Sequence, residues 1–166
     1  TIAHIIKNNF RLFPASKKHL WRGIYLPSTY GESIELAVAV DTSGSVSTLE
    51  FQEFMAEVRG IVEQFEDFTL YLFLCDTVIH DQYTITTQDY WPEKFPKHDG
   101  GTDFRPVFEE IENKNLSTSV LIYLTDGDGY YPSQGPSYPV IWVLNKENNI
   151  PWGQKIIMDI EAKRAA

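Results

Sequence analysis

The apolar stretch IELAVAV at residues 34–40 constrains the fold more than any other part of the sequence. Side chains alternate between the two faces of a strand, and apart from Glu35 this stretch is apolar on both faces. A strand of this kind is typical of a parallel sheet that is buried on both sides. Because parallel strands need long crossover connections, we expect helices between the strands.

The remaining chain contains the strands and helices that such a sheet requires. One predicted helix begins after a cap at Ser47 or Thr48 and runs to about Phe65, and another spans residues 104–113 with Pro106 in its first turn. Further strands are predicted at residues 69–74, 78–85, 119–124, 138–144 and 155–160, of which the second alternates as a hairpin or edge strand would. The sequence therefore predicts an α/β fold of Rossmann-like type, with a mostly parallel sheet and helices on both faces.

The first 33 residues differ in character from the rest of the chain. They mix aromatic and basic side chains without a sustained period, and only residues 2–10 suggest a helix. The chain starts at Thr1 with neither Met nor a signal peptide, which is typical of a piece of a longer protein. We therefore predict an N-terminal segment at residues 1–33, the end of an upstream domain, and a single domain at residues 34–166.

Charge and cysteine content narrow the classes of function. The 14 Lys and Arg residues against 23 Asp and Glu residues leave a formal net charge of −9, which repels nucleic acids and anionic lipid surfaces. No apolar stretch approaches the roughly 18 residues of a membrane span, so we expect a soluble chain. The single cysteine, Cys75, lies in an apolar run, which is typical of a core residue in a reducing compartment. These features predict a cytoplasmic protein that binds neither nucleic acid nor membranes.

Three loops are rich in glycine and in oxygen-bearing side chains. They read DTSGS at residues 41–45, HDGGTDF at 98–104 and TDGDG at 125–129, and ligands of such sheets collect at the carboxyl ends of the strands. Asp41, Ser43 and Ser45 occupy alternate positions, so their oxygens can point the same way. Hydroxyl and carboxylate oxygens without His or Cys favour a hard cation such as Mg²⁺.

These three motifs, in this order, resemble the metal-ion-dependent adhesion site of von Willebrand factor A (VWA) domains. The segments RGIYLP at residues 22–27 and YPVIWV at 138–143 more narrowly resemble the VWA-like domain at the C-terminus of bacterial metallopeptidase-like proteins. The resemblance extends over roughly residues 22–160. It implies a Mg²⁺ or Mn²⁺ ion, bound in part through water, whose ligands are Asp41, Ser43, Ser45, Thr102 and Asp126.

The resemblance implies a role in protein binding rather than catalysis. Neutral hydroxyl ligands leave the ion with surplus positive charge, which an Asp or Glu from a partner protein or from the upstream domain would complete. The chain lacks the His-Glu-x-x-His motif of zinc peptidases. Of the other polar residues, we expect Asp103 and Asp128 to be solvated or outer carboxylates and His98 to be a surface histidine. Tyr130 and Tyr131, at the mouth of the site, are candidates for contact with a partner.

Two alternative functions are phosphate chemistry and nucleotide binding. A Mg²⁺-dependent phosphatase or phosphotransferase would use Asp41 as nucleophile, with Lys146 behind the phosphate. Enzymes of the haloacid dehalogenase type place a second Asp two residues later, where this chain has Ser43. Nucleotide binding has less support, because neither Gly-x-Gly-x-x-Gly nor Gly-Lys-Ser/Thr follows a strand. We therefore expect a metal-dependent interaction module without enzymatic activity of its own.

Overall fold

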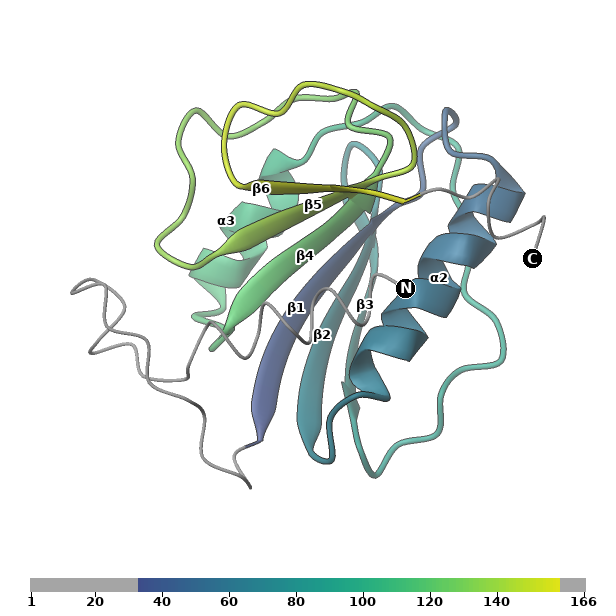
Figure 1. Cartoon of the computed structure of the whole chain (residues 1–166), viewed down its shortest axis with the longest axis vertical. Coiled ribbons are helices and arrows are strands. Elements are labelled where there is room, and N and C mark those ends of the chain that lie inside the picture. The colour runs from purple at the N-terminus through teal and green to yellow at the C-terminus, as the bar shows by residue number, and fades with distance from the viewer. Residues whose placement is uncertain (1–32, 159–166) are drawn as a thin grey trace.

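The computed structural model describes residues 33–158, which form one six-stranded sheet with helices packed against it (Figure 1). In chain order the elements are β1 (Ile34–Asp41), α2 (Thr48–Val62), β2 (Phe68–Cys75), β3 (Ile79–Thr86), α3 (Arg105–Asn113), β4 (Val120–Thr125), β5 (Val140–Leu144) and β6 (Gln154–Ile157). The predicted helix at residues 2–10 lies outside the described residues. Within residues 33–158, none of the helices has the length and apolar character needed to cross a bilayer.

The strands lie in the order β3-β2-β1-β4-β5-β6, and every neighbouring pair is parallel except β2 and β3. β1, the strand from which the fold was predicted, lies between β2 and β4, and its last six residues are buried. β3 is an antiparallel edge strand, as its alternating pattern indicated. The predicted α/β architecture with a mostly parallel sheet is therefore confirmed.

Three predicted elements have a boundary that differs from the structure by more than one residue. β5 begins at Val140 rather than at residue 138, because Pro139 precedes it and has no N–H with which to extend the ladder. β6 spans Gln154–Ile157 where 155–160 was predicted, and residues 159 and 160 lie outside the described part of the chain. α2 ends at Val62 rather than near Phe65, because the chain closes there in a turn in which the Phe65 N–H donates to the Val62 carbonyl.

The two faces of the sheet are covered differently. Leu36, Val38 and Val40 of β1 belong to the core on the α2 side, whereas Ala37 and Ala39 belong to the core on the α3 side. The small alanines leave room for large buried side chains on the α3 side, which include Phe104, Phe108, Tyr123 and Trp142. Helices on both faces, as predicted, leave the carboxyl edge of the sheet as the place where the three loops meet.

The start of each helix fixes the position of one of these loops. Ser47 caps α2: its Oγ accepts a hydrogen bond from the Glu50 N–H at 3.2 Å, and Glu50 Oε2 accepts one from the Ser47 N–H at 2.7 Å. α3 begins without a side-chain cap but with Pro106 in its first turn, as predicted.

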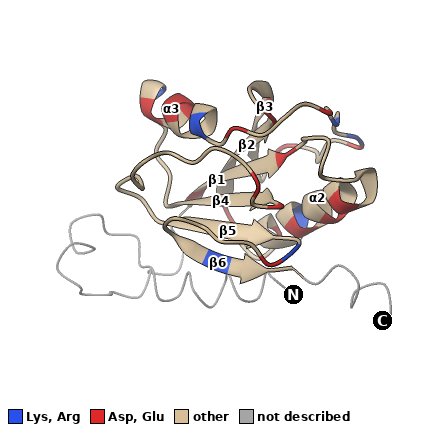
Figure 2. Ribbon diagram, turned by 90° about the horizontal axis from the view of Figure 1, so that it is seen from above, with Lys and Arg blue, Asp and Glu red and all other residues tan. Residues whose placement is uncertain are grey.

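Acidic residues end β1 and follow β4 at the same edge of the sheet, where Figure 2 shows them in red.

Candidate functional site

The first loop leaves β1 at Asp41, which is 1% exposed. Asp41 Oδ1 accepts a hydrogen bond from the Ser43 amide at 2.8 Å, and Oδ2 accepts one from the Thr125 hydroxyl at 2.6 Å. The hydroxyl oxygens of Ser43 and Ser45 lie 3.2 Å apart. The spacing of the motif therefore does place the two serine oxygens side by side, while Asp41 also ties the first loop to the end of β4.

The second loop, which carries Thr102, rests on Asp76, the residue after β2. Asp76 Oδ2 accepts a hydrogen bond from the Gly100 N–H at 3.2 Å, and the Asp76 carbonyl accepts one from the Asp103 N–H at 2.9 Å. A Cβ atom on Gly100 would lie 2.3 Å from Asp76 Oδ2, so glycine is required for this close approach. A Cβ atom on Gly129 would lie 2.7 Å from Thr102 Cγ2. Gly100 thus allows the second loop to pack against Asp76, and Gly129 allows the third loop to pack against the Thr102 side chain.

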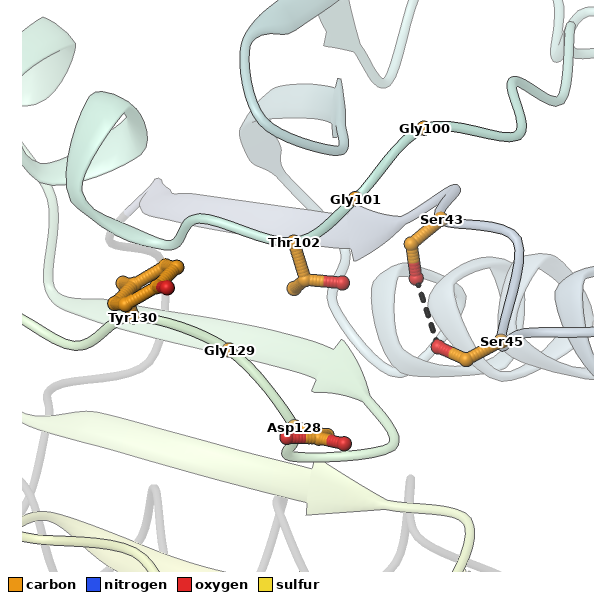
Figure 3. A pocket seen from close by; sticks show the side chains of 8 residues that line it. All are labelled: Ser43, Ser45, Gly100, Gly101, Thr102, Asp128, Gly129 and Tyr130. Carbon is orange, nitrogen blue, oxygen red and sulfur yellow. Dashed lines mark hydrogen bonds between the residues drawn. The ribbon is translucent and has the colours of Figure 1, made fainter.

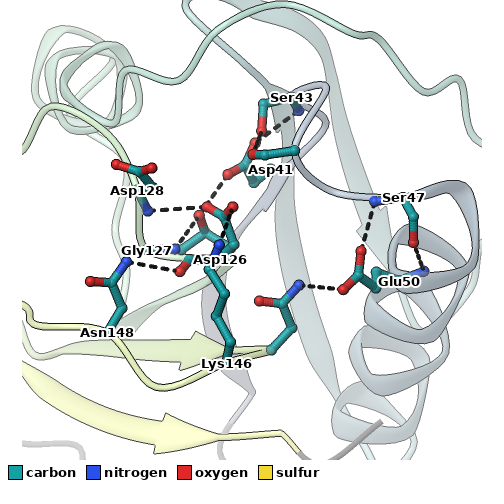
Figure 4. A network of polar contacts seen from close by, with 12 residues as sticks. Asp41, Ser43, Ser47, Glu50, Asp126, Gly127, Asp128, Lys146 and Asn148 are labelled. Atoms are coloured by element: carbon teal, nitrogen blue, oxygen red, sulfur yellow. Dashed lines mark hydrogen bonds and ion pairs between the residues drawn. The ribbon is translucent and has the colours of Figure 1, made fainter. Parts of the chain in front are cut away.

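The third loop begins with Asp126, which follows β4 and is 1% exposed. Asp126 Oδ1 accepts a hydrogen bond from the Asp128 amide at 3.0 Å, and Oδ2 lies 3.1 Å from Lys146 Nζ (Figure 4). The Asn148 side-chain amide donates to the Asp126 carbonyl at 3.2 Å. Gly127 has a φ of +81°, a backbone conformation that favours glycine. Both oxygens of the Asp126 carboxylate are therefore already in use.

An open cavity of about 490 Å³ lies between the three loops (Figure 3). It is lined by Ser43, Ser45, Gly100, Gly101, Thr102, Asp128, Gly129 and Tyr130. Asp41 and Asp126 are not part of this lining; Asp41 accepts a hydrogen bond from the Ser43 amide, and the Ser45 side chain lies close enough to Asp126 to lower its pKa. The structure thus brings the three predicted hydroxyl ligands to one cavity and places the two predicted carboxylates directly behind the serines.

The two buried carboxylates differ in their electrostatic surroundings. Burial is the largest influence on Asp41 and raises its pKa; hydrogen bonds from Ser43 and Thr125 act against this rise, and the charge of Asp126 adds to it. Burial also acts to raise the pKa of Asp126, but the Asp128 amide, Lys146 and Ser45 outweigh it and lower the pKa. Of these two acids, only Asp126 has a cationic partner among residues 33–158.

This donor set fits a hard divalent cation. Two carboxylates and three hydroxyls, with no nitrogen or sulfur ligand, offer the oxygen chemistry that Mg²⁺ and Mn²⁺ prefer. Within the described part of the chain no group of three or more His, Cys, Asp or Glu side chains could hold a metal by itself, so an ion at this edge would depend on the hydroxyls. A cation here would also offset the repulsion between Asp41 and Asp126. When bound, the ion supplies a positive charge that can attract an anionic ligand.

Comparison with known proteins identifies the family. A sequence model described as "VWA-like domain (DUF2201)" matches residues 36–159, which is more than half of the chain. The chain belongs to this family. No curated protein matches the sequence significantly.

A solved structure supports the same fold for this VWA-like domain. The VWA2 paralog of ArnB from Sulfolobus acidocaldarius, a crystal structure, superposes with a TM-score of 0.57 at 19% sequence identity. The match covers 70% of this chain and 36% of that chain, so the VWA-like domain spans about a third of the Sulfolobus protein. At this identity the likeness shows the fold alone.

Sequence reasoning missed one contact that supports the site in this VWA-like domain. Asp76 anchors the loop that carries Thr102, and its position directly after a buried strand, like those of Asp41 and Asp126, is the signal that could have found it. Asp128, which we expected to be a solvated or outer carboxylate, is exposed and lines the cavity. Tyr130 also lines it and is 70% exposed.

Other residues near the site have structural partners. The Tyr131 hydroxyl donates to the Gly127 carbonyl at 2.8 Å, which supports the third loop. His98 Nε2 lies 3.0 Å from Asp81 Oδ2, and the His98 ring stacks on the His80 ring with centroids 3.8 Å apart. Cys75 is buried, as expected of a core residue, and burial raises the pKa of its thiol to about 12.

Proposed function

We propose that this VWA-like domain binds a partner protein through a divalent cation, Mg²⁺ or Mn²⁺. The residues that hold the ion, in part through water, are Asp41, Ser43, Ser45, Thr102 and Asp126. An Asp or Glu carboxylate from the partner completes the coordination shell. The observation that carries the proposal is the convergence of three hydroxyl side chains on one cavity, directly in front of two buried carboxylates.

The charges around the cavity favour an anionic ligand. The three hydroxyl ligands that line the cavity are neutral, and Asp41 and Asp126 lie behind them, so a divalent ion would keep positive charge on the side that faces the partner. The occupied site would therefore be locally positive in a chain whose formal net charge is −9. Because this attraction acts at contact distance, added salt should weaken partner binding only slightly.

A binding role without catalysis agrees with the position of Asp41. In the alternative function, as a phosphatase or phosphotransferase, Asp41 would have to attack a phosphate. Its side chain is 1% exposed, and each of its oxygens already accepts a hydrogen bond, from Ser43 and from Thr125. Attack on a phosphate would require Asp41 itself to reach the cavity, whereas in the binding function the serine hydroxyls face the cavity and Asp41 acts on the ion through a coordinated water.

The partner carboxylate has two candidate sources. One is a separate protein, and the other is an upstream domain of a larger cytoplasmic, metallopeptidase-like protein to which this VWA-like domain would belong. In both cases the domain would present or assemble a partner rather than transform it. The chemistry at the ion is the same, so one experiment tests both sources.

The test is a pull-down from cell lysate with the immobilised chain as bait, in Mg²⁺ and in EDTA. We expect a partner to be recovered in Mg²⁺ and lost in EDTA. Thr102→Ala should abolish recovery, because it removes one hydroxyl ligand without changing the net charge. Thr84→Ala, the same change at an exposed position of the edge strand β3, is the matched control and should bind as the wild type does. A partner recovered equally by all variants, with or without EDTA, would show that recognition uses another surface.

A further inference from the structure

Lys146 directly contacts one of the proposed metal ligands. Its Nζ lies 3.1 Å from Asp126 Oδ2, at the end of a side chain that extends from the segment after β5 toward the end of β4 (Figure 4). The Lys146 side chain is 55% exposed, whereas the Asp126 side chain is 1% exposed. The ion pair thus joins a buried carboxylate to a long side chain that is able to turn toward solvent.

We propose that Lys146 is a built-in cation that neutralises Asp126 in the metal-free protein and is displaced when a divalent ion binds. This inference rests on the proposed function, because it concerns the same site. Lys146 therefore has two opposite effects. It stabilises the metal-free fold by pairing with a buried charge, and it weakens metal binding by competing for that charge.

Competition follows from the limited number of free oxygen positions on Asp126. Oδ1 already accepts the Asp128 amide, so a cation or its coordinated water must approach the carboxylate largely through Oδ2, where the ammonium lies. A divalent ion and an ammonium group a few ångströms apart also repel each other strongly. Metal binding consequently requires the ammonium to move away.

The surrounding backbone allows the ammonium to leave without unfolding the loop. Asn145, the neighbouring residue, donates a side-chain hydrogen bond to Glu50 Oε1 at 2.8 Å, which ties this segment to α2. Asn148 donates to the Asp126 carbonyl at 3.2 Å, which ties it to the third loop. Both anchors are independent of Lys146, so its side chain can change rotamer while the loop stays in place.

The first test measures the affinity for Mg²⁺ and Mn²⁺ by calorimetry in four versions of the chain. These are the wild type, Lys146→Met, Lys146→Gln and the control Lys114→Met. Lys114 follows the C-terminal end of α3, which leads to the start of β4 at the opposite edge of the sheet. Lys114→Met therefore changes the net charge by the same amount as Lys146→Met, but far from the site. Removal of one charge beside a divalent ion should strengthen binding by roughly tenfold or more in both Lys146 variants. The control should bind within about twofold of the wild type.

The second test follows the metal-free state and the release of Lys146. In EDTA, Lys146→Met should melt at a lower temperature than the wild type and Lys114→Met, because Asp126 loses its cationic partner. In the wild type, an amine-reactive ester should modify Lys146 faster in Mg²⁺ than in EDTA, as read by peptide mass spectrometry. Lys146→Gln keeps a hydrogen-bond donor for Asp126, so its affinity can be read even if Lys146→Met fails to fold.

The outcomes separate this inference from the proposed function. Equal or weaker metal binding by both Lys146 variants, or equal labelling of Lys146 in Mg²⁺ and EDTA, would overturn the inference. If the wild type binds no metal and the Lys146 variants do, Lys146 blocks the site and only the proposed metal dependence of the wild type fails. If no version binds a divalent ion, both proposals fail.

Discussion

Substitution of Gly100 tests whether the second loop is positioned by its contact with Asp76. In Gly100→Ala the added Cβ would lie 2.3 Å from Asp76 Oδ2 and 2.7 Å from Asp76 Cγ, so the whole carboxylate must move. Overpacking of this kind costs about 1–3 kcal/mol. A lost hydrogen bond from the Gly100 amide to a charged acceptor costs about 1.5–3 kcal/mol. Because the two costs partly overlap, we expect the free energy of unfolding to fall by about 2–4 kcal/mol.

The assay is thermal unfolding of the metal-free chain in EDTA, followed by circular dichroism. A loss of this size corresponds to a melting temperature lower by roughly 5–15 °C for a domain of this length. Gly44→Ala is the control, because a Cβ atom there would meet its nearest neighbour, the Asp99 carbonyl oxygen, at 3.4 Å, an ordinary contact. Its stability should stay within about 1 kcal/mol of the wild type. Equal melting temperatures for Gly100→Ala and Gly44→Ala would refute the packing argument.

Three further changes probe the site. Gly129→Ala would place a Cβ 2.7 Å from Thr102 Cγ2, and the shift of this ligand should weaken Mg²⁺ binding by about 10–100-fold in calorimetry; unchanged affinity would contradict it. Asp41→Asn should abolish metal binding, while the melting temperature of this variant in EDTA stays within about 5 °C of the wild type. If the variant is unfolded, Asp41 has a purely structural role. Burial acts to raise the pKa of Asp76, but hydrogen bonds from His80 and the Val78 amide outweigh it and lower the pKa. The stability that Asp76 contributes is therefore present at neutral pH and lost as the pH falls below about 4, so melting in EDTA should decline more steeply with acid for the wild type than for Asp76→Asn.

Much of this architecture can be read from local sequence patterns. The apolar run of β1 predicted a strand buried on both faces, because a two-residue period leaves few other ways to bury Leu36 and Ala37 together. The alternate spacing of Ser43 and Ser45 predicted that their oxygens would lie side by side, as they do at 3.2 Å. The helix cap was predicted at Ser47 or Thr48, because short hydroxyl side chains favour that position, and the structure places it at Ser47.

The contacts that adjust the site could not be predicted in the same way. Lys146 and Asp126 are 20 residues apart and meet because β4 and β5 are neighbours in the sheet, an order that no local pattern encodes. Asp76 resembles any aspartate in a turn until the structure shows Gly100 packed against it. Whether a carboxylate lines a cavity, as Asp128 does, or lies behind it, as Asp41 does, depends on backbone directions set by the folded loops.

The central claim, that the three loops form a divalent cation site, is tested most directly by melting the wild-type chain in EDTA and in millimolar Mg²⁺, with Ser43→Ala as the matched variant. An ion that binds only the folded state stabilises it by about 2.7 kcal/mol at a hundredfold excess over its dissociation constant. We expect Mg²⁺ to raise the melting temperature of the wild type by roughly 5–10 °C and that of Ser43→Ala by much less. Superimposable wild-type curves in EDTA and Mg²⁺, with no heat of binding in calorimetry, would contradict the claim.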